Sequence, residues 1–364
     1  MLDPEYVAHM TDRLTELWAE LEDEILRDMA RKIRKADYFV PAADWQMQKL
    51  IEAGVMRDEI VRKLAKMLGI TKAELMRMMR EAGAMSLKSD ISAAGGKVTL
   101  DYKDLISSPA LIGILSAGYE QTLGEFTNLT RTTAGAASQQ FIDAMDDVWM
   151  QVNSGAFSVS AACDIACIKL AKDGIHAVRY PTGHIDTIET AVRRAARTGV
   201  NQTAARVSDQ TAEELEIDLV VTTAHAGARP THAVWQGKVF SRSGKSKKYP
   251  GLREGTGYGT GAGLCGWNCR HNFRVYVDGT PLPYSEAQLA AFNAKSREYG
   301  GKKMTEYEAS QVQRYMERTV RAWKRREAVG DPAASAKVKQ WQDRLADFTD
   351  KTGLRRQYDR EKIY

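Results

Sequence analysis

The chain has 364 residues, of which 43% are hydrophobic and 27% charged, and this composition excludes a fibrous protein and a chain disordered throughout. Its length allows two or three domains. The net charge of +5 is uneven, because residues 301–364 carry sixteen Lys and Arg against ten Asp and Glu while the remainder is close to neutral.

Neither an export signal nor a membrane span is predicted. The first thirty residues form a charged amphipathic stretch that includes Asp12, Arg13 and Glu16, whereas a signal peptide has a basic start followed by an apolar run. The stretch from Leu105 to Tyr119 contains Ser, Pro and Gly and falls short of the ~20 apolar residues that a spanning helix needs. We therefore expect a soluble protein without a membrane partner.

The N-terminal region, residues 1–95, is predicted to be helical. Apolar residues recur on one helical face at Leu14, Leu17, Leu21, Ile25 and Met29. A second apolar cluster, Ile60 to Leu68, ends at Gly69, and Thr71 with Glu74 then forms a capping box for a further helix. We interpret these as two packed helices, and not as a DNA-binding helix-turn-helix, because the second offers few base-reading side chains.

The central region, residues 96–217, is also predicted to be helical, with a boundary at Ala93 to Lys97. Cys163 and Cys167 lie one helical turn apart and are interpreted as small core residues in preference to a reactive pair. A long helix is predicted from Ile185 to about Leu215. Its outward residues are expected to be Arg193, Arg194, Arg197 and Arg206, and its inward residues Ile188, Val192, Ala196 and Val200.

A small β-rich module is predicted at residues 218–283, embedded in a mainly α protein. Asp218 to Ala224 is short and β-branched, and Ala233 to Phe240 and Phe273 to Val277 are also typical of strands. Asp278-Gly279 is a turn dipeptide. The fold class is therefore expected to be mainly α with an embedded α+β module.

The C-terminal region, residues 284–364, is predicted to return to basic helices. Ser285 with Gln288 forms a capping box. Gly330-Asp-Pro332 separates two helices. The apolar stripes of these two helices are expected at Tyr307, Val312, Tyr315, Thr319 and Trp323, and at Val338, Trp341, Leu345 and Phe348.

Two blocks in the β-rich module are unusually dense in His, Cys, Gly and Trp. They read His225-Ala-Gly-Ala-Arg-Pro-Thr-His232-Ala-Val-Trp235-Gln-Gly237-Lys238 and Gly263-Leu-Cys265-Gly-Trp-Asn268-Cys269-Arg270-His271. Together they resemble the signature of the phage minor capsid protein 2 family of tailed phages and prophages. The resemblance covers nearly the whole chain through Ala36 to Phe39 with Trp45-Gln46, Asn128 to Thr133, Arg193 to Gln202, and Tyr307 to Arg314. The layout is also similar to that of phage head-morphogenesis proteins.

This resemblance implies a structural component of the phage head, assembled in the bacterial cytoplasm and present in few copies per virion. It implies association with portal or inner capsid proteins and a role in head assembly, DNA packaging or ejection, and it implies no catalytic activity. Arg274 departs from the family pattern, which leads us to expect proline. The signature residues expected to bind, without an assigned role, are His225, Gly227, Arg229, His232, Trp235, Gln236, Asn268 and Arg270.

The same blocks contain five metal-ligand types within fifty residues: His225, His232, Cys265, Cys269 and His271. Zinc prefers four nitrogen and sulfur ligands in a tetrahedron, and a small Gly-rich module gains stability by binding one. A structural zinc held by Cys265, Cys269, His271 and one of the two upstream histidines is therefore a hypothesis. The alternative is a buried hydrogen-bonded network without metal, because Cys-x3-Cys-x-His is not the usual zinc-knuckle spacing.

An enzyme is the rival interpretation from another class. A Cys–His pair is the arrangement of a nucleophile and its base, and the histidines with Asn268 resemble a His-Asn-His nuclease. Glu254 is the single carboxylate residue between His225 and Arg270, however, and phosphodiester cleavage by a hard cation requires acidic ligands. We therefore expect no catalytic residue.

One glycine-rich segment and two basic segments are the ones to consider for phosphate contacts. Gly255 to Gly263 lacks the Gly-Lys-Ser/Thr ending of a phosphate loop and is predicted to be a connector. Arg242 to Lys248 is a basic loop, and Lys324, Arg325 and Arg326 lie opposite the stripe that contains Trp323. Non-specific contacts of these three residues with packaged DNA are a hypothesis, against the alternative of a solvated basic face.

Overall fold

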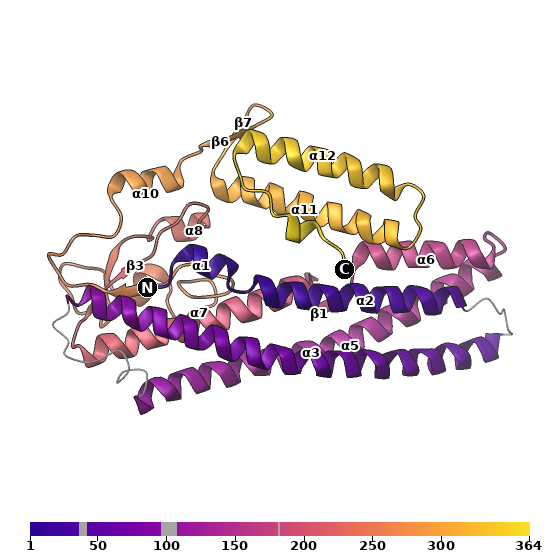
Figure 1. Ribbon diagram of the computed structural model, residues 1–364, viewed down its shortest axis with the longest axis horizontal. Helices are drawn as coiled ribbons and strands as arrows, with labels where there is room; N and C mark the ends of the chain where they lie inside the picture. The colour runs from indigo at the N-terminus through magenta and orange to yellow at the C-terminus, as the bar shows by residue number, and fades with distance from the viewer. Residues whose placement is uncertain (36–41, 96–107, 181–182) are drawn as a thin grey trace. The chain divides into compact units, whose positions relative to one another are not determined.

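The computed structural model describes residues 1–35, 42–95, 108–180 and 183–364, and it confirms a mainly α protein with a small β-rich module (Figure 1). The 36–39 block of the family resemblance, and residues 96–97 of the expected boundary, lie outside the described residues. So do residues 105–107 of the apolar stretch that ends at Tyr119.

Long helices make up most of the described chain. They are α2 (Asp12–Lys35), α3 (Ala42–Ala93), α5 (Pro109–Asn153), α6 (Val159–Asp173), α7 (Ile188–Glu214), α11 (Glu306–Ala328) and α12 (Ala334–Thr352). The shorter helical segments are α1 (Pro4–His9), α8 (Pro230–Ala233), α9 (Leu252–Thr256), α10 (Glu286–Asn293) and the 3₁₀ helix η1 (Tyr358–Glu361). The capping box expected at Ser285 and Gln288 is confirmed at the start of α10.

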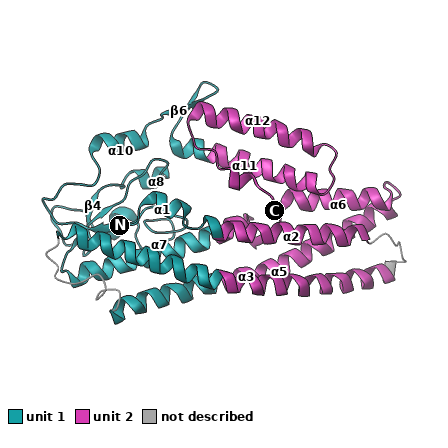
Figure 2. Ribbon diagram, in the orientation of Figure 1, with its two compact units in different colours: residues 1–13, 71–125, 193–310 teal, residues 14–70, 126–192, 311–364 magenta. Residues whose placement is uncertain are grey.

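The chain divides into two compact units, each built from segments far apart in the sequence (Figure 2). Unit 1 comprises residues 1–13, 71–125 and 193–310, and unit 2 comprises residues 14–70, 126–192 and 311–364. The divisions fall inside the long helices α2, α3, α5, α7 and α11. The β-rich module expected at residues 218–283 lies wholly within unit 1, and the expected division into four consecutive regions stays a prediction.

Unit 1 contains a three-stranded antiparallel sheet in the order β4-β3-β5. The strands are β3 (Leu219–Thr222), β4 (Val239–Ser241) and β5 (Phe273–Val275), and Val220 pairs with both Phe240 and Val275. The hydrophobic cluster beneath this sheet consists of Ala205, Val220, Trp235, Phe240, Leu252, Leu264, Cys265 and Phe273. Since Ala205 belongs to α7, the module shares its core with a long helix and does not fold as an isolated insertion.

Helices α5 and α7 approach closely in unit 1 through two reciprocal Gly–Thr contacts. A Cβ atom added at Gly118 would collide with the Thr203 side chain, and one added at Gly199 would collide with Thr122. Each threonine hydroxyl donates to a glycine carbonyl one turn earlier in its own helix, Thr122 to Gly118 at 2.7 Å and Thr203 to Gly199 at 2.8 Å. These glycines are therefore required for helix packing.

Unit 2 is helical, with a short antiparallel hairpin formed by β1 (His176–Arg179) and β2 (Ile185–Thr187). The apolar face expected on α2 is buried at Leu14, Leu21, Ile25 and Met29, whereas Leu17 is half-buried. The ring of Trp18 on the same helix packs against Phe126, with ring centroids 5.9 Å apart. Hydrophobic periodicity in the sequence therefore locates this core correctly.

Three expectations for the helices are wrong. Helix α3 continues through Gly69, so neither two packed helices nor a helix-turn-helix exists there; a single glycine costs a helix only about 1 kcal/mol. Arg197 points inward, because its guanidinium donates to the carbonyl oxygens of Val7 and Ala8. The buried face of α11 contains Met316 and Val320, whereas the expected stripe residue Tyr315 is exposed.

The strand expectations need two corrections. Residues from Ala233 to Phe240 are not one strand, because Pro230 begins the short helix α8 and only Val239 and Phe240 enter β4. The hairpins β1–β2 and β6 (Arg297–Tyr299)–β7 (Lys302–Met304) are absent from the sequence-based prediction. Their strands have three or four residues, which is too short for alternation to stand out.

Candidate functional site

The candidate site lies in unit 1, where two loops beside β3 and β5 bring the two sequence blocks together. His225 follows β3, His232 lies on α8, and His271 precedes β5. The pairing of β3 with β5 continues beyond the strands, since the Thr223 backbone N–H donates to the Asn272 carbonyl at 2.8 Å. Residues about forty positions apart in the sequence are therefore held side by side.

Close backbone approaches shape the loop that contains Cys265 and Cys269. A Cβ atom on Gly263 would collide with the backbone of Gly257, and one on Gly266 would collide with the backbone of Gly261. The Gly255 to Gly263 segment is therefore a tightly packed connector, as expected, in which Gly257 ends α9 in the left-handed region.

Two residues of this loop that are not glycine also adopt the left-handed region, Cys265 at φ 57° and Asn268 at φ 54°. Asn268 is held from both sides. Its side-chain oxygen accepts from Arg197 at 2.6 Å, and its backbone N–H donates to the Thr198 hydroxyl at 2.9 Å. The inward-pointing Arg197 therefore supports the strained part of the loop.

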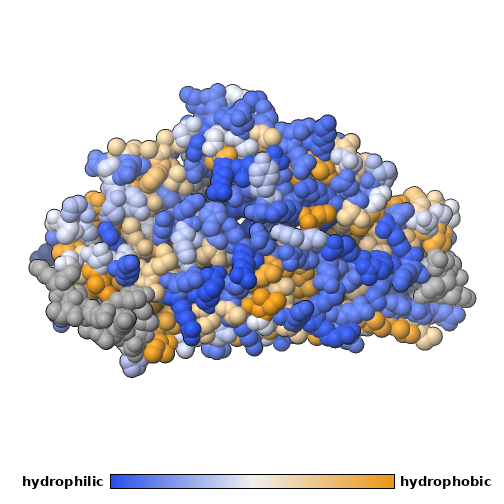
Figure 3. All heavy atoms as spheres, in the orientation of Figure 1, coloured by the Kyte–Doolittle hydropathy of each residue, from blue (hydrophilic) through white to orange (hydrophobic). Residues whose placement is uncertain are grey.

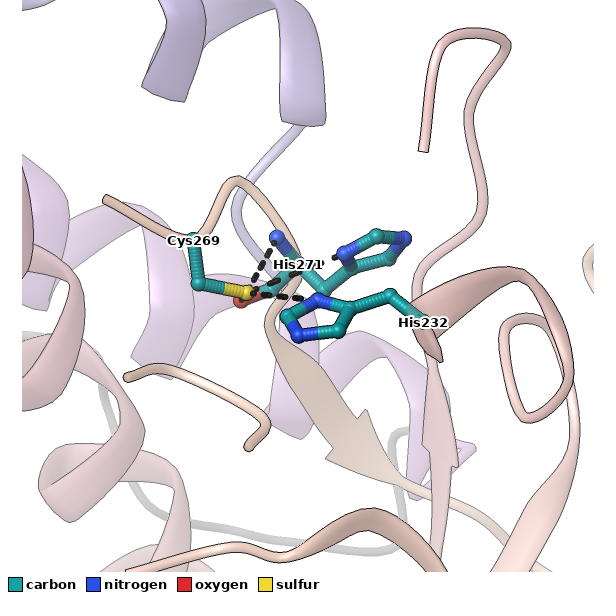
Figure 4. Close-up of side chains that lie close together, drawn as sticks. All are labelled: His232, Cys269 and His271. Carbon is teal, nitrogen blue, oxygen red and sulfur yellow. Dashed lines mark hydrogen bonds between the residues drawn. The ribbon is translucent and has the colours of Figure 1, made fainter. Parts of the chain in front are cut away.

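His232, Cys269 and His271 form the Cys/His cluster at the centre of the site (Figure 4). The Cys269 sulfur lies 3.6 Å from His232 Nδ1 and 3.7 Å from His271 Nδ1. The His271 backbone N–H also donates to this sulfur, at 3.3 Å. Each of the three residues is at most 2% exposed.

Hydrogen bonds on the side of each ring away from the sulfur fix the tautomers of His232 and His271. His232 Nε2 lies 2.9 Å from the Ala262 carbonyl oxygen, which only accepts, so Nε2 carries the hydrogen. His271 Nε2 lies 3.1 Å from Gln236 Oε1. That oxygen also accepts from the His225 backbone N–H, and the Gln236 amide nitrogen donates to Asn293, so its orientation is settled. Both Nδ1 atoms therefore present lone pairs to the sulfur.

Burial disfavours the charged forms of the three cluster side chains. It lowers the pKa of His232, and it lowers the pKa of His271 well below the usual 6.5, with a further contribution from His225. Burial also raises the pKa of the Cys269 thiol. A thiol is a weaker nucleophile than a thiolate, so a raised thiol pKa disfavours nucleophilic attack by Cys269.

The other two expected metal ligands lie beside the cluster but outside it. Cys265 is buried, and its thiol donates to the His271 carbonyl oxygen at 3.5 Å. The His225 ring stacks on the His271 ring, with centroids 4.4 Å apart, and burial lowers its pKa to about 3. The structure therefore brings together three of the five predicted ligands and keeps two adjacent.

The remaining signature residues hold the loops in place. The Trp235 ring lies against both cluster histidines, with centroids 4.7 Å from His232 and 4.8 Å from His271. Arg270 donates to the carbonyl oxygen of Gly227 at 3.2 Å, and Arg229 donates to that of Trp267. These side chains connect the first block to the second.

Sequence reasoning missed Asn201 as part of the site. This α7 residue is fully buried, and its amide donates to the carbonyl oxygens of Cys269 at 3.2 Å and His271 at 2.9 Å. Asn272 in turn donates to Asn201 at 2.7 Å. The sequence did contain a signal for Asn201, because this residue lies in the Arg193 to Gln202 block that carries the family resemblance.

Two of the three predicted DNA-contact residues of α11 pair with carboxylates of unit 2. Arg325 is buried and donates to Glu22 and Asp23, so its charge is not available to a phosphate and that expectation is corrected. Arg326 donates to Asp331 at 2.6 Å, and Lys324 is half-buried. The charge count of residues 301–364 therefore overstates the free positive charge of this helix.

The comparisons with known proteins agree with the sequence blocks. The family model of phage minor capsid protein 2 matches residues 2–351. A structural protein of Lactococcus phage LL-H is 30% identical over 199 residues, covering 50% of each chain. A structural protein of Lactococcus phage mv4 is 35% identical over 128 residues, covering 32% of this chain and 93% of its own.

Two further findings bear on the identity of the chain. No solved structure matches it significantly. None of the helices in the described ranges has the length and apolar character needed to cross a bilayer. The match of the family model extends from residue 2 to residue 351 and so includes both compact units and the whole candidate site. The chain therefore belongs to the phage minor capsid protein 2 family.

Proposed function

We propose that this chain acts as a minor structural component of a tailed-phage head that binds the portal or the inner surface of the capsid. In that position it works during head assembly, DNA packaging or ejection. Membership of a minor capsid family and the similarity to two phage structural proteins support this proposal. The chain aligns with only half the length of the LL-H protein, so the partner is inferred from the chain itself.

The observation that carries the proposal is an exposed apolar stripe at the start of α3 in unit 2. Met47 and Leu50 are each 60% exposed, Ile51 54% and Val55 45%. Spacings of three and four place them on one helical face. Large side chains grouped this way on a surface mark an interaction site more often than single exposed apolar residues do.

The exposed face of α3 becomes mixed after Val55, where Val61 is still 46% exposed. Asp58 and Arg62 continue the same face, and both are exposed and charged. The face of the molecule drawn in Figure 3 is mainly hydrophilic, with smaller hydrophobic patches between the polar side chains. An apolar stripe bounded by charge is the pattern of a docking surface with a polar rim.

Co-expression with the portal and capsid proteins of the same phage genome tests this function. The wild-type chain is expected to co-elute with one of them in size-exclusion chromatography. Leu50→Lys with Ile51→Lys is expected to abolish co-elution, because it places two charges in the centre of the apolar stripe. Arg62→Glu is the matched control on the same helix face and is expected to co-elute. Failure of the wild-type chain to bind either protein would contradict the proposal.

A further inference from the structure

We propose that the Cys/His cluster of unit 1 is a structural zinc site, with His232 Nδ1, Cys269 Sγ and His271 Nδ1 as ligands. The inference does not depend on the partner proposed above, because it rests on the geometry inside the module. It names the ligand atoms of the three residues that already lie together and assigns the fourth position to His225.

The spacing of the three atoms fits a zinc ion. Zn–S bonds of about 2.3 Å and Zn–N bonds of about 2.05 Å at tetrahedral angles require a sulfur–nitrogen separation of about 3.5 Å. The Cys269 sulfur lies 3.6 Å from one Nδ1 atom and 3.7 Å from the other. All three ligand atoms lie within 4.8 Å of one another. The two nitrogens therefore lie no more than 4.8 Å apart, and zinc requires them about 3.3 Å apart.

The cluster has fewer hydrogen-bond donors than lone pairs, which favours a bound cation over a metal-free network. Both Nδ1 atoms present lone pairs to the Cys269 sulfur, because each Nε2 atom donates its hydrogen elsewhere. A thiol has one hydrogen, so it satisfies one ring and leaves the second lone pair facing sulfur in a buried site. A zinc ion with a thiolate satisfies both rings and the sulfur together.

The hydrogen-bond partners of the two ligand histidines are of the kind found around metal-binding histidines. A metal-binding histidine commonly donates its second ring N–H to a carbonyl or carboxylate oxygen, which fixes its tautomer and orientation. His232 donates to the Ala262 carbonyl and His271 to the Gln236 amide oxygen. The backbone N–H of His271 donates to the Cys269 sulfur and would stabilise a thiolate there.

We assign His225 as the fourth ligand, although it lies outside the group of atoms within 4.8 Å of one another and its ring must move toward the ion. Its Nδ1 atom lies 2.6 Å from the Ala226 carbonyl oxygen and carries the hydrogen, so Nε2 presents a lone pair. That Nε2 atom is buried and has no hydrogen-bond partner among the described residues. The Cys265 thiol already donates to the His271 carbonyl. Four protein ligands in a buried site give a closed shell, which is the arrangement of structural zinc.

Metal analysis of untagged full-length protein, purified without chelator, tests the site. One zinc ion per chain is expected, and Cys269→Ser is expected to lose it. Cys163→Ser on α6 is the matched cysteine control and is expected to retain the metal, since Cys163 belongs to unit 2. Folded wild-type protein that holds well under one zinc ion per chain, and takes up none when zinc is added, would overturn the proposal.

Cobalt substitution gives a second measurement that needs no destabilised variant. Co²⁺ bound to wild-type protein is expected to show tetrahedral d–d absorption with the charge-transfer intensity of a single thiolate. Octahedral absorption, or no cobalt binding, would overturn the site. Charge-transfer intensity of two thiolates, lost in part in Cys265→Ser and unchanged in His225→Gln, would overturn the assignment of His225 and put Cys265 in its place.

Discussion

Arg325 is a basic residue of α11 whose side chain is buried inside unit 2. Its guanidinium lies 2.8 Å from a Glu22 oxygen and 2.5 Å from an Asp23 oxygen, and all three side chains are buried. Glu22 also accepts from the Ile175 backbone N–H at 2.9 Å. The group therefore connects α2, α11 and the segment before β1. The Arg325 guanidinium is the direct ion-pair partner of both buried carboxylates.

Arg325→Ala is predicted to lower the free energy of unfolding by about 3–5 kcal/mol, because it removes the direct ion-pair partner of two buried carboxylates. Urea denaturation followed by circular dichroism measures this loss. The neighbouring change Lys324→Ala is the control and is expected to stay within about 0.5 kcal/mol of wild type. A stability unchanged by Arg325→Ala would show that the side chain is solvated, as the sequence first suggested.

Cys167 gives a prediction in alkaline solution. Burial raises the pKa of its thiol from 9.0 to about 11. Between these values the unfolded chain has lost the thiol proton and the folded chain keeps it, so the free energy of unfolding falls as pH rises. The stability difference between wild type and Cys167→Ala is predicted to shrink by about 2 kcal/mol from pH 9 to pH 11. A difference that stays constant up to pH 11 would show that the thiol is accessible to solvent.

It was easier to predict which residues belong to the site than to predict which groups each of them contacts. The His and Cys blocks were identified from the sequence, but spacing alone did not distinguish His232, which joins the cluster, from His225, which lies beside it. Arg197 was expected to be solvated like other helix arginines. Its burial depends on backbone carbonyls of Val7 and Ala8, far away in the sequence, and no local pattern reports such partners.

Among the elements, α3 is the one whose continuity is most readily tested. Gly69 lies within the helix and is exposed, and a Cβ atom added there would meet nothing within 4 Å. Gly118 on α5 is a glycine of the opposite kind, because an added Cβ would collide with Thr203. The two positions form a matched pair for the same substitution.

Gly69→Ala is predicted to raise the free energy of unfolding by about 0.5–1 kcal/mol, because alanine has the higher helix propensity and narrows the unfolded ensemble. Gly118→Ala is predicted to lower it by about 1–3 kcal/mol through overpacking. Chemical denaturation of both variants measures the two changes. A destabilising Gly69→Ala would mean that the chain turns at this position and that α3 is two helices.

Long amphipathic elements were predicted better than short ones. Periodicity located α2 and α7, and the capping box at Ser285 located α10, because these signals are local. The hairpin β1–β2 has strands of four and three residues and depends on pairing across a turn, so its sequence has no strong alternation. Gly69 misled the prediction because a helix stabilised by packing along its length tolerates one glycine.

The whole molecule consists of two compact units whose chain crosses from one to the other within helices. Each unit has a feature of its own: the Cys/His cluster lies in unit 1, and the exposed stripe of α3 lies in unit 2. In our account the first stabilises a loop-rich module and the second binds a partner in the head. Disruption of one is therefore expected to leave the other intact.

Quantitative mass spectrometry of purified heads from the phage that encodes this chain tests whether the chain is a minor component of the head. We expect the chain in the particles at a copy number far below that of the major capsid protein. We also expect it to stay with the heads after washing in high salt, because an apolar contact is not weakened by ionic screening. Purified heads that contain every other structural protein but lack this chain would contradict the account.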